Sequence, residues 1–212
     1  MSSDWLSSPP TIPVLGEPAW DVARLYPVQG AWSEDDYLAI ALTQNWLVEY
    51  TDGCVEFLPM PTIEHQLIVK FLLICLEAFS GPEKLGVVLF APLPVKTFPK
   101  KFREPDLIFN FAENHAKRKR EYYETADLVM EVVSKDRASR QRDYEQKRKD
   151  YAEAGIREYW IVDPQDKRIT VLALDNAAYV EHGVFTTGQT ASSRLLAGFE
   201  MDVEAVFAAP QA

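Results

Sequence analysis

A nearly unbroken apolar segment that contains one carboxylate constrains this chain more than any other stretch. Residues 126–134 read A-D-L-V-M-E-V-V-S, which is the pattern of a strand buried on both faces of an α/β sheet. Glu131 interrupts that pattern. Burying an unpaired carboxylate costs several kcal/mol, so Glu131 must be protonated, paired with a cation or bound to a metal ion. The sequence therefore predicts a site at this strand.

A second carboxylate stands at the start of another apolar strand. Pro105 is followed by Asp106 and then by L-I-F, which predicts a strand over residues 106–109. Hard cations such as Mg²⁺ and Mn²⁺ take carboxylate oxygens as ligands, and a bound cation of this kind can activate water. Asp106 and Glu131 are therefore candidates for a metal site that hydrolyses phosphodiester bonds.

A charged helix over residues 139–154, closed by Gly155, is predicted to bring a lysine to these acids. Asp143, Lys147 and Tyr151 are spaced i, i+4 and i+8, so they form one stripe of that helix. The stripe is either a surface ion pair above a packed tyrosine or is turned toward Glu131. Lys135 is a second candidate for the cationic role, because it shares the strand parity of Glu131.

Two residues nearer the N-terminus are weaker candidates. A hairpin is predicted around Asp-Gly at residues 52–53, and Glu49 lies in its first strand. Strand parity leaves the face of Glu49 open, and we expect an exposed hairpin glutamate. Thr62 is expected to cap a helix over residues 63–79, with His65 in its first turn. A structural histidine is the commoner case there, and contact with a phosphate or a water is the alternative.

The whole chain predicts one α/β domain over residues 31–212, a mixed sheet flanked by helices, after an extended proline-rich arm over residues 1–30. A length of 212 residues with 47% hydrophobic side chains fits this size. The remaining expected elements are helices over 33–43 and 202–208 and strands over 87–90, 93–98, 156–163, 168–174 and 178–184. Pro92, Pro94 and Pro99 predict edge positions for the strands near them, because proline cannot donate to a strand ladder.

Charge is unevenly distributed. The net charge is -10, which argues against attraction of the whole molecule to nucleic acid. Residues 96–149 nevertheless hold 15 of the 22 Lys and Arg residues and 10 of the 32 Asp and Glu residues, a local charge of +5. This basic window coincides with the candidate site. It is either a set of solvated helix faces or a track for phosphates.

The compartment is expected to be the cytoplasm. The N-terminus lacks the basic and apolar regions of a signal peptide, and the longest apolar run, residues 67–79, is shorter than the ~20 residues that a spanning helix needs. Cys54 and Cys75 form neither a disulfide framework nor a zinc pattern. We expect a soluble protein with no membrane partner.

Several motifs together resemble a known family. In order they are V-E-Y-T-D-G (48–53), E-H-Q-L (64–67), P-D-L-I-F (105–109), E-V-V-S (131–134), D-Y-E-Q-K (143–147) and Y-A-E-A-G-I-R-E-Y-W-I-V-D-P (151–164). This ordered set resembles the Uma-two family, a branch of the PD-(D/E)xK superfamily of restriction-endonuclease-like proteins. The resemblance covers residues 33–207 and implies the restriction-endonuclease-like fold.

The resemblance also implies roles for residues. Asp106 and Glu131, with a backbone carbonyl near Val132, would hold Mg²⁺ or Mn²⁺. The superfamily pattern would place its lysine at Val133, so the cationic role falls to Lys147 on the following helix or to Lys135. Asp143 would hold Lys147 in place, and His65 or Glu49 would complete the outer waters of the metal.

The implied activity is metal-dependent hydrolysis of nucleic acid, with DNA as the expected substrate. A homodimer is expected, since cutting two strands with one site per subunit favours two-fold symmetry. One alternative is an inactive nuclease-fold protein that binds nucleic acid or a protein partner. Another is a phosphoesterase acting on small nucleotides.

Overall fold

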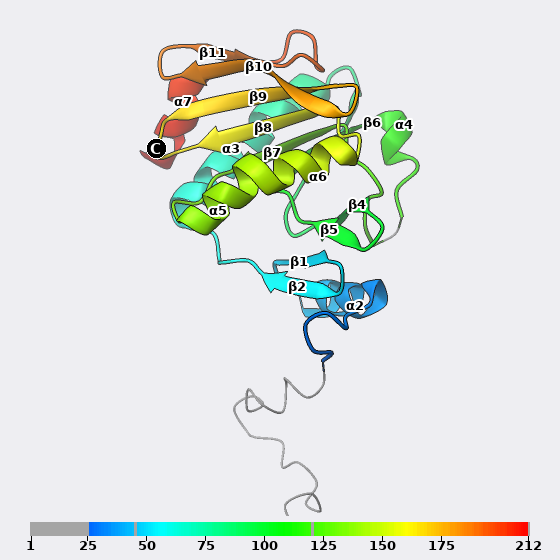
Figure 1. Ribbon diagram of the computed structural model, residues 1–212. Helices are drawn as coiled ribbons and strands as arrows, with labels where there is room; N and C mark the ends of the chain where they lie inside the picture. Colours follow the sequence, from blue (N-terminus) through cyan, green and yellow to red (C-terminus); the bar gives the residue numbers. More distant parts are fainter. Residues whose placement is uncertain (1–25, 45, 120, 212) are drawn as a thin grey trace, which may run out of the picture.

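A six-stranded mixed sheet forms the centre of the protein (Figure 1). The computed structural model describes residues 26–44, 46–119 and 121–211. In spatial order the strands are β10 (Ala178–Thr186), β9 (Arg168–Asp175), β8 (Glu158–Asp163), β7 (Leu128–Val132), β6 (Leu107–Phe111) and β3 (Gly86–Phe90). Strands β7 and β8 are parallel, and the other neighbouring pairs are antiparallel. The predicted mixed sheet is confirmed.

Helices cover both faces of this sheet. In Figure 1, α3 (Ile63–Ser80) and α7 (Val203–Ala208) lie behind it, and α5 (Arg137–Gln141) and α6 (Lys147–Glu153) lie in front. The face toward α3 and α7 buries Met130, Val132 and Trp160, among other side chains. The face toward α6 buries Val129 and Val133. Because side chains alternate along a strand, Glu131 belongs to the α6 face.

The helix after β7 is longer and less regular than predicted. It begins at Arg137 and not near Ser139, because Asp136 is the N-cap and its side chain accepts a hydrogen bond from the Ser139 backbone N–H at 2.9 Å. Between α5 and α6 the chain forms a π-helical segment, Arg142–Gln146, which sequence periodicity does not reveal. Gly155 follows the last turn with a φ of 73°, so the predicted C-terminal glycine is confirmed.

A smaller antiparallel sheet lies beside the central one, with α2 (Glu34–Gln44) packed on it. Its strands in spatial order are β2 (Cys54–Phe57), β1 (Val48–Thr51), β5 (Lys101–Arg103) and β4 (Val95–Phe98). Asp52 and Gly53 both have positive φ, 46° and 85°, which confirms the predicted two-residue hairpin turn. A Cβ at Gly53 would also lie 2.6 Å from the Gly30 carbonyl oxygen, so this turn requires glycine.

The other predicted elements are found with shifted ends, together with short elements that were not predicted. The strand expected over 126–134 is limited to β7, Leu128–Val132. Strands β3 and β4 lie at sheet edges, as their prolines predicted. The unpredicted elements are β5, β11 (Thr190–Ser192), β12 (Glu200–Asp202) and a 3₁₀ turn at Ala209–Gln211. A short helix, α4 (Ala112–His115), follows β6.

The extended arm predicted for residues 1–30 lies mostly outside the described residues. Its last part is described: Gln29 bonds both the N–H and the carbonyl of Val55, and Tyr26 stacks on Trp32. Within the described ranges, no helix has both the length and the apolar character that crossing a bilayer demands.

Candidate active site

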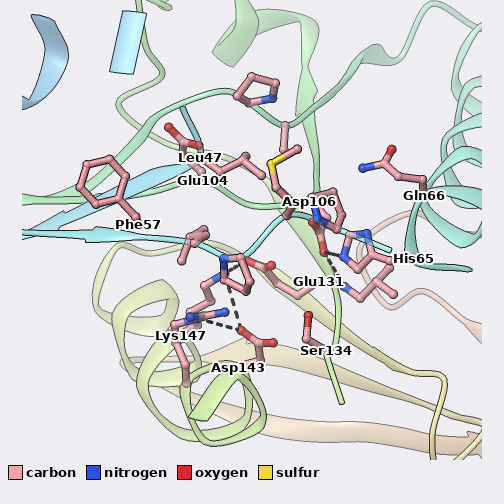
Figure 2. Close-up of a pocket in the computed structure, with 18 of the residues that line it drawn as sticks. Leu47, Phe57, His65, Gln66, Glu104, Asp106, Glu131, Ser134, Asp143 and Lys147 are labelled. Atoms are coloured by element: carbon pink, nitrogen blue, oxygen red, sulfur yellow. Dashed lines mark hydrogen bonds and ion pairs between the residues drawn. The ribbon is translucent and has the colours of Figure 1, made fainter. Parts of the chain in front are cut away.

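Strand pairing brings the two candidate acids together. Strands β6 and β7 pair with Leu107 opposite Met130, so one step further along the same register Asp106 lies opposite Glu131. Side chains at directly opposed positions point to the same face of a sheet. The two carboxylates therefore share the α6 face, and both line one cavity (Figure 2).

Asp106 is fixed from two sides. Its Oδ2 accepts a hydrogen bond from the backbone N–H of Val132 at 2.7 Å and lies 3.1 Å from Nε2 of His65. His65 reaches Asp106 from the first turn of α3, whose Thr62 cap accepts a hydrogen bond from the His65 N–H. Burial lowers the pKa of His65, but the hydrogen bond to Asp106 and the charges of Asp106 and Glu131 outweigh that effect and raise it. His65 therefore lies beside Asp106, and its contact with a phosphate or a water stays a prediction.

Glu131 is buried and held by the helix in front of the sheet. Its Oε1 accepts hydrogen bonds from Lys147 Nζ at 2.7 Å and from the Tyr151 hydroxyl at 2.6 Å. Burial raises the pKa of Glu131 more than Lys147 lowers it, and the negative charges of Asp106 and Asp143 raise it further, to about 8. The stripe of Asp143, Lys147 and Tyr151 is therefore turned toward Glu131, which was the functional alternative for that helix.

Lys147 is the central cation of the site. Its side chain is 2% exposed, and Nζ lies 3.3 Å from Glu49 Oε1 and 3.6 Å from Asp143 Oδ1 in addition to its bond with Glu131. Burial alone would lower the pKa of Lys147, but these three carboxylates raise it above its ordinary value. The lysine therefore stays an ammonium at physiological pH.

The expectation of an exposed Glu49 is wrong. Its side chain is 0% exposed and bonds the backbone N–H of Glu104 and the guanidinium of Arg103. Burial raises the pKa of Glu49, but Lys147 and Arg103 lower it by more. The reason is β5, which sequence patterns did not reveal: it pairs with β1 and brings Arg103 to Glu49, while Lys147 of α6 lies against the same carboxylate.

Lys135 is not part of this cluster. Its Nζ lies 2.8 Å from Glu64 Oε2, and its side chain is 69% exposed. The chain has left the strand after Val132, so the parity that linked Lys135 to Glu131 no longer applies. Of the two lysines, the structure brings only Lys147 to the acids.

Three residues of the site were missed by sequence reasoning. Arg103 joins the hairpin to α6, because it donates to Glu49 and, through two of its nitrogens, to Oδ2 of Asp150, at 2.6 Å for the shortest bond. Glu104 lines the cavity, and its Oε2 is buried without a hydrogen-bond partner. Arg142, from the π segment, lines the same cavity. The one available signal was the position of Glu104 directly before the Pro105-Asp106 pair.

The donor set fits a hard divalent cation. Asp106 and Glu131 each use one oxygen in hydrogen bonds, and no described residue bonds to Asp106 Oδ1 or Glu131 Oε2. In the described ranges no three His, Cys, Asp or Glu side chains are grouped as a metal site. Mg²⁺ commonly binds through one or two carboxylates and keeps several waters, so two carboxylates suffice. The acid pair could thus hold Mg²⁺ or Mn²⁺.

The cavity has two chemically different walls. It measures about 580 Å³. Figure 2 shows Asp106, Glu131, Asp143 and Lys147 on one side and Leu47 and Phe57 on another. The arrangement can bind a charged group among its acids and basic residues while an apolar group contacts the hairpin.

Comparisons with known proteins bear on the family and the fold of this chain. The model of the Uma2 family, described as "Putative restriction endonuclease", matches residues 34–204. A crystal structure from Anabaena variabilis ATCC 29413, described as "a putative nuclease belonging to DUF820", is similar with a TM-score of 0.70 and 16% sequence identity. The similarity covers 87% of this chain and 99% of that one, and at this identity it shows a shared fold. No curated protein matches the chain.

Proposed function

The chain belongs to the Uma2 family of restriction-endonuclease-like proteins, and from this premise we propose that it is a metal-dependent nuclease that hydrolyses phosphodiester bonds in DNA. One observation carries the proposal. Asp106, directly before β6, and Glu131, in the neighbouring β7, share a cavity with the buried ammonium of Lys147, which lies 2.7 Å from Glu131. Family membership supports a nuclease in general, and the choice of metal ion and of DNA belongs to this proposal.

Asp106 and Glu131 would hold a Mg²⁺ or Mn²⁺ ion, with the Val132 carbonyl as a further ligand. When bound, such an ion lowers the pKa of a coordinated water and offsets charge on the phosphate. The N–H of Val132 and the ring of His65 fix Asp106 in orientation. Because Glu131 has a raised pKa, it must release a proton before it can bind the cation, so activity should rise with pH.

Lys147 would act as a permanent charge and not as a base. Its raised pKa keeps the ammonium protonated, so it can donate hydrogen bonds to a water or a phosphate oxygen but cannot accept a proton. Positive charge at this place stabilises the negative charge that develops on the phosphate in the transition state. Asp143 and Glu49 hold the ammonium from its other sides.

The test is a cleavage assay with supercoiled plasmid and single-stranded DNA in Mg²⁺ or Mn²⁺. Asp106→Ala, Glu131→Gln and Lys147→Met should each reduce the rate by about 100-fold or more, the size expected for loss of a group that stabilises transition-state charge. Lys149→Met is the matched control, because Lys149 lies on the same helix with its side chain 76% exposed. Undiminished cleavage by Asp106→Ala or Glu131→Gln would overturn the site assignment.

A second candidate function is binding without cleavage. It is favoured by the hydrogen bonds from Lys147 and Tyr151, which satisfy Glu131 Oε1 without a metal ion. This alternative predicts no heat of binding when Mn²⁺ is titrated into the protein and intact DNA after incubation. A homodimer, a cytoplasmic location and a single domain over residues 31–212 stay predictions that accompany either function.

A further inference from the structure

The hairpin presents an unusual amount of apolar surface to the candidate active site. Phe57 is 56% exposed and Met60 is 84% exposed, and both line the cavity that contains Asp106 and Glu131. Trp46 also lines it and contacts the Phe57 ring edge-on, with 5.4 Å between ring centroids. Figure 2 shows Phe57 and Leu47 on the side of the cavity away from His65. Apolar rings left exposed at a polar site indicate contact with a ligand.

A phosphate cannot account for this wall. The phosphates of a substrate would lie at the acid and lysine side, where a cation and Lys147 can offset their charge. The group left to contact the hairpin is the base of the nucleotide, which the sugar joins to the phosphate. Every base has an apolar ring face, and such a face stacks favourably on an aromatic side chain. A nucleotide therefore matches the polar and apolar walls together.

A base in a duplex cannot make that contact. Its ring faces are covered by the neighbouring base pairs, and only its edges are open in the grooves. To lie against Phe57 the base must be single-stranded, frayed or turned out of the stack. The cavity volume of about 580 Å³ lies in the range of pockets that enclose a small molecule.

We propose that the site takes DNA with unpaired bases, and that Phe57, supported by Trp46 and Met60, stacks on the base next to the scissile phosphate. This proposal rests on the proposed function, because the phosphate position follows from the acid pair. It makes Phe57 a residue that determines specificity. The expected preference is for single strands, ends or distorted duplexes over intact duplex.

The experiment measures binding, so it is independent of cleavage. Fluorescence anisotropy would compare a labelled single-stranded DNA oligonucleotide with the blunt duplex of the same sequence, in Ca²⁺, which takes the same oxygen ligands as Mg²⁺. The single strand should bind more tightly. Phe57→Ala should weaken single-strand binding by about fivefold or more, the equivalent of 1 kcal/mol of stacking, and Phe57→Trp should restore it.

Phe98→Ala is the matched control. Phe98 is 55% exposed on β4 but does not line the cavity, so its loss should leave affinity within about twofold of wild type. Equal or tighter binding of the duplex, or wild-type affinity in Phe57→Ala, would overturn the inference. Loss of cleavage with the Phe57 effect intact would instead count against the proposed nuclease activity alone.

Discussion

Replacing Lys147 by methionine tests whether one ammonium holds the buried acids together. Methionine keeps most of the side-chain volume, so the change removes charge and little packing. Glu131, Glu49 and Asp143 then lose the cation that lies 2.7, 3.3 and 3.6 Å from their oxygens. Glu131 already carries a proton below its pKa of about 8. Burial raises the pKa of Glu49 and Lys147 is the charge that lowers it most, so without Lys147 Glu49 is the carboxylate that must take up a proton.

The size of the effect follows from that proton. Protonating a carboxyl with an unfolded pKa of about 4.3 costs about 1 kcal/mol at pH 5 and about 3.7 kcal/mol at pH 7. The folded variant binds one proton more than the wild type does, while the unfolded chains differ only by the lysine. Its stability relative to wild type therefore falls by about 1.4 kcal/mol per pH unit between pH 5 and pH 7.

The assay is urea denaturation of wild type and Lys147→Met at pH 5, 6, 7 and 8, followed by far-UV circular dichroism. Lys149→Met, from the exposed side of the same helix, should stay within about 0.5 kcal/mol of wild type at every pH. A loss of stability in Lys147→Met that does not change with pH, or one no larger than in Lys149→Met, would refute the reasoning.

Three further predictions concern neighbouring groups. Glu104→Gln should be more stable than wild type by about 2 to 4 kcal/mol at pH 9 but not at pH 4. Burial raises the pKa of Glu104 to about 8, so the wild type loses stability as the pH rises through that value, and the glutamine variant does not. Urea denaturation at both pH values checks this. Asp163→Asn should lower the free energy of unfolding by about 2 to 4 kcal/mol at pH 7, because Asp163 accepts hydrogen bonds from Arg140 and Tyr144. The pKa of Asp163 is lowered, so the wild type loses the same charge in acid and the difference in urea denaturation should shrink near pH 3. Mg²⁺ should raise the melting temperature more at pH 8.5 than at pH 6, because it competes with a proton on Glu131, and Glu131→Gln should abolish that rise.

Much of the central sheet was predictable because its signals are local. The apolar run around Glu131 forces a buried strand, so the cost of burying a carboxylate singles out Glu131. Pro105 and the apolar residues after Asp106 predict a second strand, and Asp106 is singled out by its place at the start of it. The helix that carries Lys147 was predictable from its spacing and from Gly155. The choice between Lys147 and Lys135 was not, because it depends on where β7 ends and how the chain turns after it.

Long-range pairing explains what was missed. Nothing in the local sequence of Glu49 shows that β5 will pair with β1 and bury it, since that contact joins residues about fifty positions apart. Arg103 lies in a strand of three residues, too short for a periodic signal. The π segment that carries Asp143 depends on packing of the helix against the sheet, which periodicity does not encode.

The central claim is that Asp106 and Glu131 together bind a divalent cation. The most direct measurement is a crystal structure of the protein grown with Mn²⁺ and recorded at a wavelength where manganese scatters anomalously. The account predicts an anomalous peak in contact with carboxylate oxygens of both Asp106 and Glu131, lost in Asp106→Ala. A manganese peak that contacts neither carboxylate, or none in the cavity while Lys147 still bonds Glu131, would contradict it.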